Sequence, residues 1–188
     1  HARLVAELDG YGVAHALAPC AESGGFALVY DHKGDRTLDL LGHAAPIAHL
    51  PPDLAAARAI IVGPILQETP PELVARIAAA SDAPIFLDPQ GMLRRIGPSG
   101  RIEHVCDEGF ARVAPRCHVI KANELEARVI TGVDPREDGP AAVARLRATG
   151  CAIAIVTLAE AGSLIDDGRR QYVIPAYATD AIDPTGAG

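Results

Sequence analysis

The segment Cys117-His118-Val119-Ile120-Lys121-Ala122-Asn123-Glu124-Leu125-Glu126 contains the change of pattern that decides the fold class. Residues 117–121 form a short apolar run of the kind that makes a buried strand. Residues 123–131 then follow a helical pattern, because Asn123 is a good N-cap and Gly132 ends the run. A buried strand that leads directly into a helix is typical of α/β proteins.

The alternation of strand and helix continues on both sides of this segment. We predict further strands at residues 59–63, 84–88 and 152–157, and helices at residues 2–8, 53–58, 71–81, 107–113 and 139–149. The run 59–63 is strongly apolar, as in a strand that is buried on both faces. Strands that alternate with helices predict an α/β fold with a doubly wound, mostly parallel sheet and right-handed crossovers.

Two hairpins are expected outside this alternating core. Residues 25–30 and 36–40 are strand-like and are joined by the polar turn Asp31-His32-Lys33-Gly34-Asp35. Residues 163–166 and 171–174 form a second, closing hairpin. Short strand-like runs separated by such turns are typical of antiparallel pairs.

Composition limits the class of protein. The chain has 188 residues, which corresponds to one domain or to one domain and a small appendage. It is 49% hydrophobic but only 4% aromatic, with no Trp, which suits an α/β fold better than a β-sandwich. The formal charge of −7 and the lack of a basic stripe argue against nucleic acid as a partner. Because this charge would also repel ATP at long range, a nucleotide site has to offset it locally with amides, a Lys or Arg, and Mg²⁺.

The cysteines and the hydropathy indicate a cytoplasmic setting. The four cysteines show neither a C-x-x-C pair nor metal-ligand spacing, and Cys117 and Cys151 fall at strand-like positions, as small core residues do. Reduced thiols are the default inside the cell. We see no apolar run of transmembrane length and no signal peptide, so we expect no membrane partner. Since the chain begins with His1 and ends within a motif, we expect a fragment of a longer protein that lacks both ends.

Polar residues lie where the predicted parallel strands end. Ligands of open α/β sheets bind beyond these carboxyl ends, and here the ends hold Asp88, Lys121, Asn123 and Thr157. Asn123 and Glu126 have the spacing of a capping box, so a purely structural role is one interpretation. In the other, Glu126 orders a Mg²⁺-bound water while Asn123 points at phosphates, since Mg²⁺ keeps several waters and takes few carboxylates directly.

Two further segments at strand ends have a plain and a functional interpretation. Thr157-Leu158-Ala159-Glu160-Ala161-Gly162 is either an ordinary loop or a backbone ledge under a nucleotide, with the Thr157 hydroxyl and amides reaching phosphate. Arg94 and Arg95 follow the segment Asp88-Pro89-Gln90-Gly91. We expect these two arginines to be solvated rather than directed at phosphate.

The last six residues, Asp183-Pro184-Thr185-Gly186-Ala187-Gly188, have the pattern of an anion-binding turn. Pro184 biases Asp183 towards an extended backbone, and the two glycines allow a tight fold with the amides pointing one way. Such a nest of N–H groups attracts phosphate. The alternative is an ordinary Pro-Thr-Gly turn.

Taken together, these segments resemble the ribokinase (PfkB) family of small-molecule carbohydrate kinases. The segment 183–188 matches the family signature D-x-T-G-A-G-D up to its last letter. Asn123 and Glu126 match its N-x-x-E motif. The segment 157–162 matches its T-x-G-x-x-G nucleotide loop, apart from Ala159, which replaces the first glycine. The order and spacing of these segments agree with those of the family from Ile60 to the end of the chain.

The resemblance implies an ATP-dependent phosphoryl transfer to a hydroxyl of a small sugar, a related polyol or a nucleoside. It assigns Glu126 to Mg²⁺ through water, and it assigns Asp183 and Thr185 to a monovalent cation such as K⁺ in members that use one. The family's anion hole for the γ-phosphate would consist of Gly186, Ala187 and Gly188. The nucleotide contacts would come from Asn123, Thr157, Leu158, Ala159, Glu160, Ala161, Gly162 and Gly188.

The resemblance also implies a division of the chain. Residues 13–45 would be a partial β lid that covers the acceptor and pairs subunits into a homodimer, and residues 46–188 would be the α/β nucleotide-binding core. The family's general base is an Asp directly after the final glycine, which lies beyond Gly188. Because loss of such a base typically lowers the rate by ~10²–10⁴, we expect these 188 residues by themselves to be inactive.

Other functions are weighed against this one. A Rossmann dehydrogenase would need G-x-G-x-x-G after an early strand, and no such run follows Val62 or Leu87. A non-catalytic regulator that binds sugar or nucleotide on the same fold stays open, because fold does not fix function. A nucleoside kinase stays open as well, since the sequence does not identify the acceptor.

Overall fold

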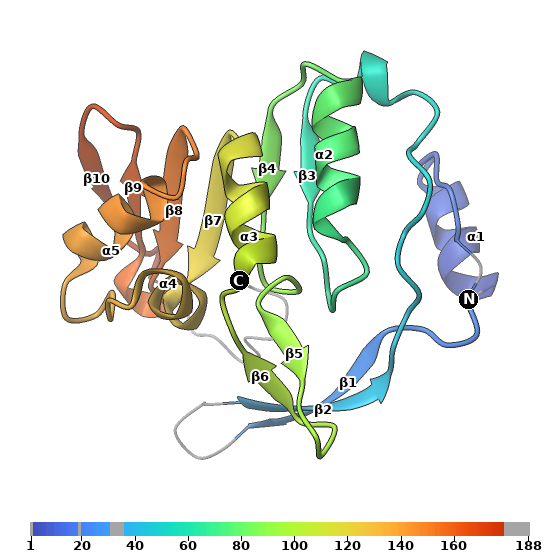
Figure 1. The fold of residues 1–188 in the computed structure, drawn as a ribbon, viewed down its shortest axis with the longest axis horizontal. Helices are drawn as coiled ribbons and strands as arrows, with labels where there is room; N and C mark the ends of the chain where they lie inside the picture. The colour runs from blue at the N-terminus through green and yellow to red at the C-terminus, as the bar shows by residue number, and fades with distance from the viewer. Residues whose placement is uncertain (1, 19, 31–35, 179–188) are drawn as a thin grey trace.

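The computed structural model of the chain describes residues 2–18, 20–30 and 36–178. The predicted turn at 31–35 and the motif Asp183–Gly188 lie outside the described residues. In the described part, a central sheet has the strand order β10-β9-β8-β7-β4-β3 (Figure 1). Its strands are β3 (Ile60–Val62), β4 (Ile85–Leu87), β7 (Val119–Asn123), β8 (Ile153–Thr157), β9 (Ser163–Asp166) and β10 (Gln171–Ile174).

The sheet is mostly parallel, as the sequence predicts. Strands β3, β4, β7 and β8 are parallel neighbours, whereas β9 and β10 add an antiparallel edge. Both closing strands have the predicted bounds, and the parallel strands differ from prediction by one or two residues at their ends. Parallel strands need a crossover connection, and a helix is the usual way to supply it.

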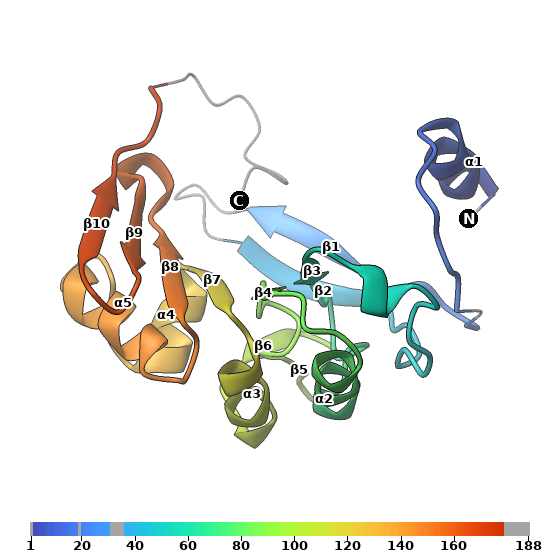
Figure 2. The ribbon, with the colours of Figure 1, turned by 90° about the horizontal axis from the view of Figure 1, so that it is seen from above.

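The crossover helices lie on one side of this sheet (Figure 2). They are α2 (Pro71–Ala80), α3 (Glu108–Val113), α4 (Glu124–Thr131) and α5 (Gly139–Arg147). Strand residues that face them alternate with more exposed ones, so Ile60 and Val62 are buried while Ile61 between them is 81% exposed. The expectation that this strand is buried on both faces is therefore not met within the described residues.

Polar caps explain where two of the helices begin. The carboxylate of Asp107 accepts hydrogen bonds from the amides of Gly109 (2.8 Å) and Phe110 (3.4 Å). Asp138 accepts from the amide of Ala141 (3.0 Å) at the start of α5. A side-chain oxygen at the N-cap satisfies an amide that has no partner within the helix. Asp107, predicted as the first residue of its helix, is therefore the cap that precedes it.

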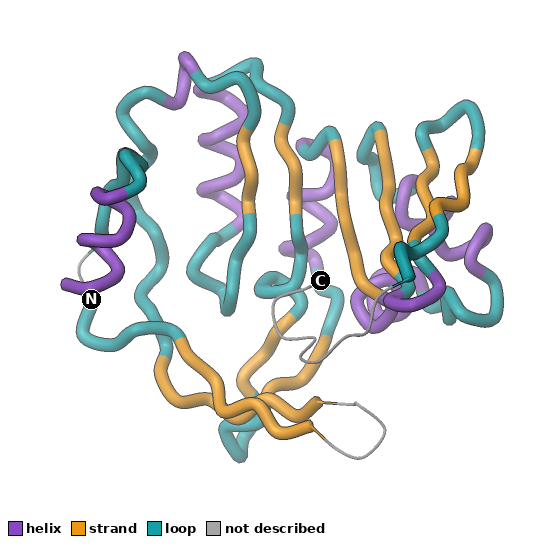
Figure 3. The backbone as a smooth tube through the Cα atoms, turned by 180° about the vertical axis from the view of Figure 1, so that it is seen from behind, coloured by secondary structure: helices purple, strands orange, loops and turns teal. Residues whose placement is uncertain are grey.

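The amino-terminal part holds α1 (Ala2–Gly10) and the antiparallel hairpin of β1 (Gly25–Tyr30) and β2 (Arg36–Gly42). Only a short 3₁₀ turn at Leu54–Ala56 forms where we predict a helix over 53–58. Seen from behind in Figure 3, hairpin β1–β2 lies beyond the ends of the parallel strands, away from the sheet.

A second hairpin, absent from the sequence prediction, connects β1–β2 to the sheet. It consists of β5 (Arg94–Ile96) and β6 (Ile102–His104). Its turn, Gly97-Pro98-Ser99-Gly100, is the signal that could have revealed it. The two hairpins share a small hydrophobic core, which comprises Leu38, Leu66 and Ile102 with Phe26, Leu40 and Ile96 packed against them.

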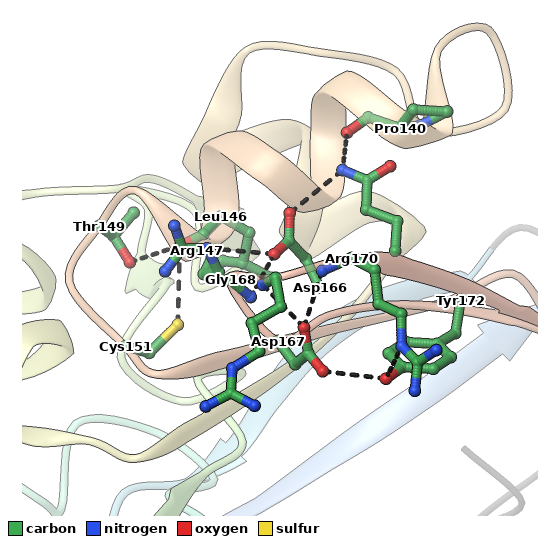
Figure 4. Close-up of polar contacts among 12 residues, drawn as sticks. Pro140, Leu146, Arg147, Thr149, Cys151, Asp166, Asp167, Gly168, Arg170 and Tyr172 are labelled. Carbon is green, nitrogen blue, oxygen red and sulfur yellow. Dashed lines mark hydrogen bonds and ion pairs between the residues drawn. The ribbon is translucent and has the colours of Figure 1, made fainter.

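A polar network ties the turn between β9 and β10 to α5 (Figure 4). Asp166 is 8% exposed and lies 3.1 Å from the Nε of Arg147. Its carboxylate also accepts from the amide of Gly168 (2.8 Å) and from Nε2 of Gln171 (3.1 Å). Asp166 pairs in register with Ala154 near the start of β8. This network therefore lies at the amino end of the parallel strands.

Candidate active site

The carboxyl ends of β7 and β8 bring two of the predicted motifs together. Asn123 ends β7, Thr157 ends β8, and the two residues are register partners in the parallel pair. The N-x-x-E segment and the loop 157–162 thus start from adjacent positions on the sheet. The strand order explains this meeting, because parallel neighbours present their carboxyl ends at the same edge.

Asn123 and Glu126 form a complete capping box at the start of α4. The Glu126 amide donates to Oδ1 of Asn123 (2.9 Å), and the Asn123 amide donates to Oε2 of Glu126 (2.9 Å). Nδ2 of Asn123 donates to Oε1 of Glu126 at 2.8 Å. The structural interpretation of this pair is therefore confirmed. Each carboxylate oxygen can still accept a further hydrogen bond, so a role toward magnesium stays a prediction.

Glu126 is an unusual carboxylate because it is only 4% exposed. Burial raises its pKa; the hydrogen bond from the Asn123 amide opposes this shift, as do the charges of Lys121 and Arg94, while the charge of Asp88 adds to it. A nearby cation would relieve the desolvation of such a group. Buried carboxylates with raised pKa values concentrate at functional sites.

Asp88 and Lys121 complete a charged cluster at this edge. The Nζ of Lys121 lies 3.4 Å from Oδ2 of Asp88. The two side chains are 28% and 34% exposed, so they border solvent. The cluster therefore brings charges of both signs to the carboxyl ends of β4 and β7, beside Glu126.

The loop 157–162 has a strained, compact backbone. Leu158 donates to the carbonyl of Gly162 (2.7 Å), and Gly162 donates to that of Ala159 (3.0 Å). Ala159 has φ 46°, a left-handed conformation that costs a non-glycine residue about 1–2 kcal/mol. Gly162 has φ 90°, and a Cβ there would lie 2.0 Å from the carbonyl oxygen of Ile174. The close approach of β10 thus requires a glycine as the last residue of this loop.

Arg136 links this loop to the start of α4, which the sequence does not indicate. Its guanidinium reaches Glu124 at 2.6 Å and Glu160 at 2.7 Å. Glu124 is the first residue of α4, and Glu160 belongs to the loop. Because Arg136 lies in the connection between α4 and α5, only the tertiary fold brings it to both carboxylates. The two contacts bridge the two motifs.

Arg94 corrects one sequence expectation. Only Arg95 is exposed, whereas Arg94 is 5% exposed. The Arg94 guanidinium donates to the carbonyl of Ile65 (2.8 Å) and to Oε1 of Gln90 (3.1 Å). Its charge acts on Glu126. Arg94 therefore belongs to the interior side of the charged edge.

Other features of the described residues delimit the site. Asp183, Thr185, Gly186, Ala187 and Gly188 lie outside the described residues. Within the described ranges, no group of three or more His, Cys, Asp or Glu side chains is placed to hold a metal ion. Nor does any helix there combine the length and apolarity that a membrane span requires. The cysteine prediction holds, because Cys117 and Cys151 are each 3% exposed.

A cavity of about 550 Å³ lies elsewhere, beside β3. Most of its lining is apolar and comes from residues 16–18, the loop 45–51 and the start of α2. It contains none of the charged residues of the sheet edge. The charged edge rather than this cavity is the candidate site, because two of the predicted motifs meet there.

Known structures share this fold. One is a pyrophosphate-dependent kinase in the ribokinase family, solved as a sulfate complex (TM-score 0.76, 19% identity, 95% of this chain and 62% of that chain). Others are ribokinase of Arabidopsis thaliana complexed with ribose and ATP (0.70, 21%, 99% and 61%) and ribokinase from Giardia lamblia (0.72, 18%, 99% and 58%). At these identities the likeness establishes the fold alone. The chain spans about three fifths of the length of these structures.

Sequence comparison assigns the family directly. No curated protein matches the chain. The family of pfkB carbohydrate kinases, however, matches residues 54–188, which include the N-x-x-E segment, the loop 157–162 and the closing motif. Together with the ribokinase fold and the meeting of the first two motifs at one sheet edge, this match shows that the chain belongs to the pfkB family of carbohydrate kinases.

Proposed function

We propose that the protein transfers the γ-phosphoryl group of ATP to a hydroxyl of a small sugar or a related polyol. The observation that carries the proposal is the register pairing of Asn123 with Thr157, which joins the N-x-x-E and nucleotide-loop motifs at the charged end of the sheet. Phosphoryl transfer needs little covalent chemistry from the protein, so positioning and charge stabilisation are the main demands on such a site.

The donor would lie against the loop 157–162. Leu158, Ala161 and Gly162 already donate hydrogen bonds within the loop, and the Glu160 amide interacts with its own carboxylate. With respect to the described residues, this leaves the Thr157 hydroxyl and the amide of Ala159 for phosphate. Asn123 would contact the nucleotide from the adjacent strand end. Gly186, Ala187 and Gly188 would supply the anion hole for the transferring group, and loss of one such donor typically raises the barrier by about 3 kcal/mol.

Magnesium suits the chemistry of this edge. Mg²⁺ usually keeps several waters and binds through one or two carboxylates and substrate phosphates, so a dedicated cluster of protein ligands is not needed. Glu126 would hold the ion through water, and its burial makes a nearby cation favourable. When bound, Mg²⁺ supplies charge neutralisation for the donor phosphates. Asp183 and Thr185 would serve a monovalent cation such as K⁺.

The acceptor would lie between the charged edge and the hairpin β1–β2. In this proposal residues 13–45 form a lid region and residues 46–188 form the nucleotide-binding core. Val29 and Leu41 on the hairpin are 57% and 73% exposed, and covering such apolar residues supports a homodimer through the lid. The Arabidopsis structure contains ribose, and a pyrophosphate-dependent relative contains myo-inositol, which supports a small polyhydroxylated acceptor here.

The decisive test is turnover by the full-length protein with Mg²⁺-ATP and a panel of sugars, polyols and nucleosides. ADP release with a sugar or polyol is the expected result. Release only with nucleosides would change the acceptor class to that of a nucleoside kinase. ATP binding with no turnover across the panel would contradict the proposal and indicate a non-catalytic regulator.

Pyrophosphate is a second candidate donor. Three structures that share this fold are pyrophosphate-dependent kinases of the ribokinase family or a variant of one. In addition, Ala159 departs from the glycine of the family's nucleotide loop. The same panel run with pyrophosphate in place of ATP decides this point. Turnover with pyrophosphate and none with ATP would assign it as the donor.

A further inference from the structure

We propose that Arg94 is a positioning residue that fixes the hairpin β1–β2 relative to the charged edge of the sheet and thereby sets the affinity for the acceptor. The acceptor part of this inference rests on the proposed function. Arg94 opens β5, directly after the loop that leaves the carboxyl end of β4. It therefore lies on the path between the charged edge and the hairpins.

The guanidinium of Arg94 is held on the core side by defined hydrogen bonds. It donates to the carbonyl of Ile65 at 2.8 Å and to Oε1 of Gln90 at 3.1 Å. The backbone carbonyl of Arg94 accepts from Nε2 of Gln67 at 3.0 Å. A planar guanidinium that is hydrogen-bonded in two directions has little rotational freedom. These bonds hold its charge in the interior of the protein, where Arg94 is only 5% exposed.

The same guanidinium contacts the hairpin. Its Cζ lies 5.1 Å from the ring centroid of Phe26 in β1. Phe26 pairs in register with Leu40 of β2, and both pack against the small core that the two hairpins share. A cation over an aromatic face is attracted by the ring, and the attraction grows when the pair is desolvated. Arg94 thus joins the hairpin to the loops of the sheet edge.

The loops that hold Arg94 are closely packed against each other. Gly91 approaches Pro64 and Ile65 so closely that a Cβ would lie 2.5 Å from the carbonyl carbon of Pro64. Gln67 has φ 57°, which is unfavourable for a residue other than glycine. Such strain persists only where the surrounding structure enforces it, and it concentrates at binding sites. Because these loops hold the guanidinium from one side, we infer that the position of Arg94 determines that of Phe26 on the other side.

Arg94 is also joined to the charged edge along the chain, because it follows the loop that begins with Asp88 at the carboxyl end of β4. The residue therefore contacts the hairpin through Phe26 and the loop of the charged edge through Gln90. We infer that loss of the guanidinium loosens the hairpin, which weakens acceptor binding and leaves the donor loop 157–162 in place.

The test compares Arg94→Met with Arg95→Met in the full-length protein. Arg95 is the exposed neighbour on the same strand, so it is a matched control. For Arg94→Met we expect the acceptor KM to rise about tenfold, as loss of a desolvated cation–π contact implies, with the donor KM unchanged. Arg94→Lys keeps the charge but loses the fork of donors, so we expect partial rescue. Arg95→Met should leave both KM values unchanged.

A second measurement does not depend on turnover. Hydrogen–deuterium exchange of residues 25–30 and 36–42 should be faster in Arg94→Met than in wild type, with no change in Arg95→Met. If Arg94→Met folds poorly, Phe26→Leu removes the ring from the other side and should accelerate exchange in the same strands. Combined with Arg94→Met, Phe26→Leu should add little further effect, since both substitutions remove the same contact between Arg94 and Phe26.

The outcomes separate this inference from the proposed function. Unchanged exchange in the hairpin for both Arg94→Met and Phe26→Leu would overturn the inference, whatever the kinase activity. An equal rise in donor and acceptor KM would also overturn it, because a general loss of structure would then explain the effect. Wild-type protein without turnover would contradict the proposed function, while the exchange experiment would still decide whether Arg94 fixes the hairpin.

Discussion

Two buried carboxylates lie at opposite ends of the same sheet, and their partners differ. Asp166, at the amino end of the parallel strands, is surrounded by the guanidinium of Arg147, the amide group of Gln171 and a backbone amide. Among the described residues, only Asn123 donates hydrogen bonds to Glu126 at the carboxyl end, and burial raises the pKa of Glu126. Both side chains are less than one tenth exposed.

The difference teaches how a structural carboxylate can be told from a functional one. A buried charge that is matched by a cation and several donors stabilises a fixed arrangement. A buried carboxylate that is capped but still penalised by desolvation favours a cation that arrives with a ligand. Burial by itself therefore does not assign a role; the partners do.

The largest effect should come from the glycines that accompany the two carboxylates. Gly162 and Gly168 both have positive φ, but a Cβ on Gly162 would meet the backbone of Ile174 at 2.0 Å, whereas on Gly168 it would meet the mobile end of Arg147 at 2.9 Å. We expect Gly162→Ala to lower the free energy of unfolding by roughly 3 kcal/mol or more, and Gly168→Ala by about 1 kcal/mol. Urea unfolding measures both. Equal losses would contradict the assignment of the Gly162 contact.

The next effect separates the carboxylates by activity. Glu126→Gln should lower kcat/KM by about 10- to 100-fold, the range seen when a residue that orients metal-bound water is removed. Asp166→Asn is the matched control and should leave kcat and both KM values unchanged. Steady-state kinetics with Mg²⁺ titration measures this difference. Loss of activity in the control alone would reverse the two assignments.

The control variant, which should keep its activity, should lose stability. Asp166→Asn removes the charge that faces Arg147, whose side chain is 39% exposed. Since solvent screens part of this pair, we expect a loss of about 1 kcal/mol in the free energy of unfolding. Thermal and urea unfolding at low and high salt measure it. A stability equal to that of wild type would mean that the network in Figure 4 contributes nothing measurable.

The pH dependence of stability provides a further contrast. The folded-state pKa of Glu126 is raised by burial, so the folded protein holds this proton to higher pH than the unfolded chain does. Its contribution to stability is therefore fully present below the unfolded pKa and is lost as pH rises through the folded pKa. Wild type should lose stability relative to Glu126→Gln as pH rises from the ordinary Glu value of 4.5 through the raised folded-state pKa of Glu126. A constant difference across this window would contradict the shift.

The smallest effect concerns the link between the two motifs. Arg136→Met removes the contacts to Glu124 and Glu160, which are surface pairs that solvent screens. We expect the donor KM to rise about two- to fivefold, because the loop 157–162 loses its link to α4. Arg128→Met, which breaks the exposed pair with Asp134, is the control and should leave the donor KM unchanged.

Much of the fold could be predicted from the sequence because its signals are local. The strands and crossover helices from residue 59 onward were predicted to within two residues at nearly every boundary, and both closing strands were predicted without error. Hydrophobic period, caps such as Asn123 and glycines such as Gly132 act within a few residues. The hairpin β5–β6 was missed because its strands are only three residues long and depend on packing against β1–β2.

The candidate site also has features that are local in sequence and features that depend on the fold. Side-chain chemistry and spacing are local properties, so the sequence alone predicts the family, the motif residues Asn123, Glu126 and Thr157–Gly162, and the strand ends on which they lie. The folded chain adds that Asn123 and Thr157 are neighbours, that Arg136 joins their segments, and that Arg94 is buried against Phe26. Strand order and burial depend on contacts between residues far apart in sequence, and no local pattern records them.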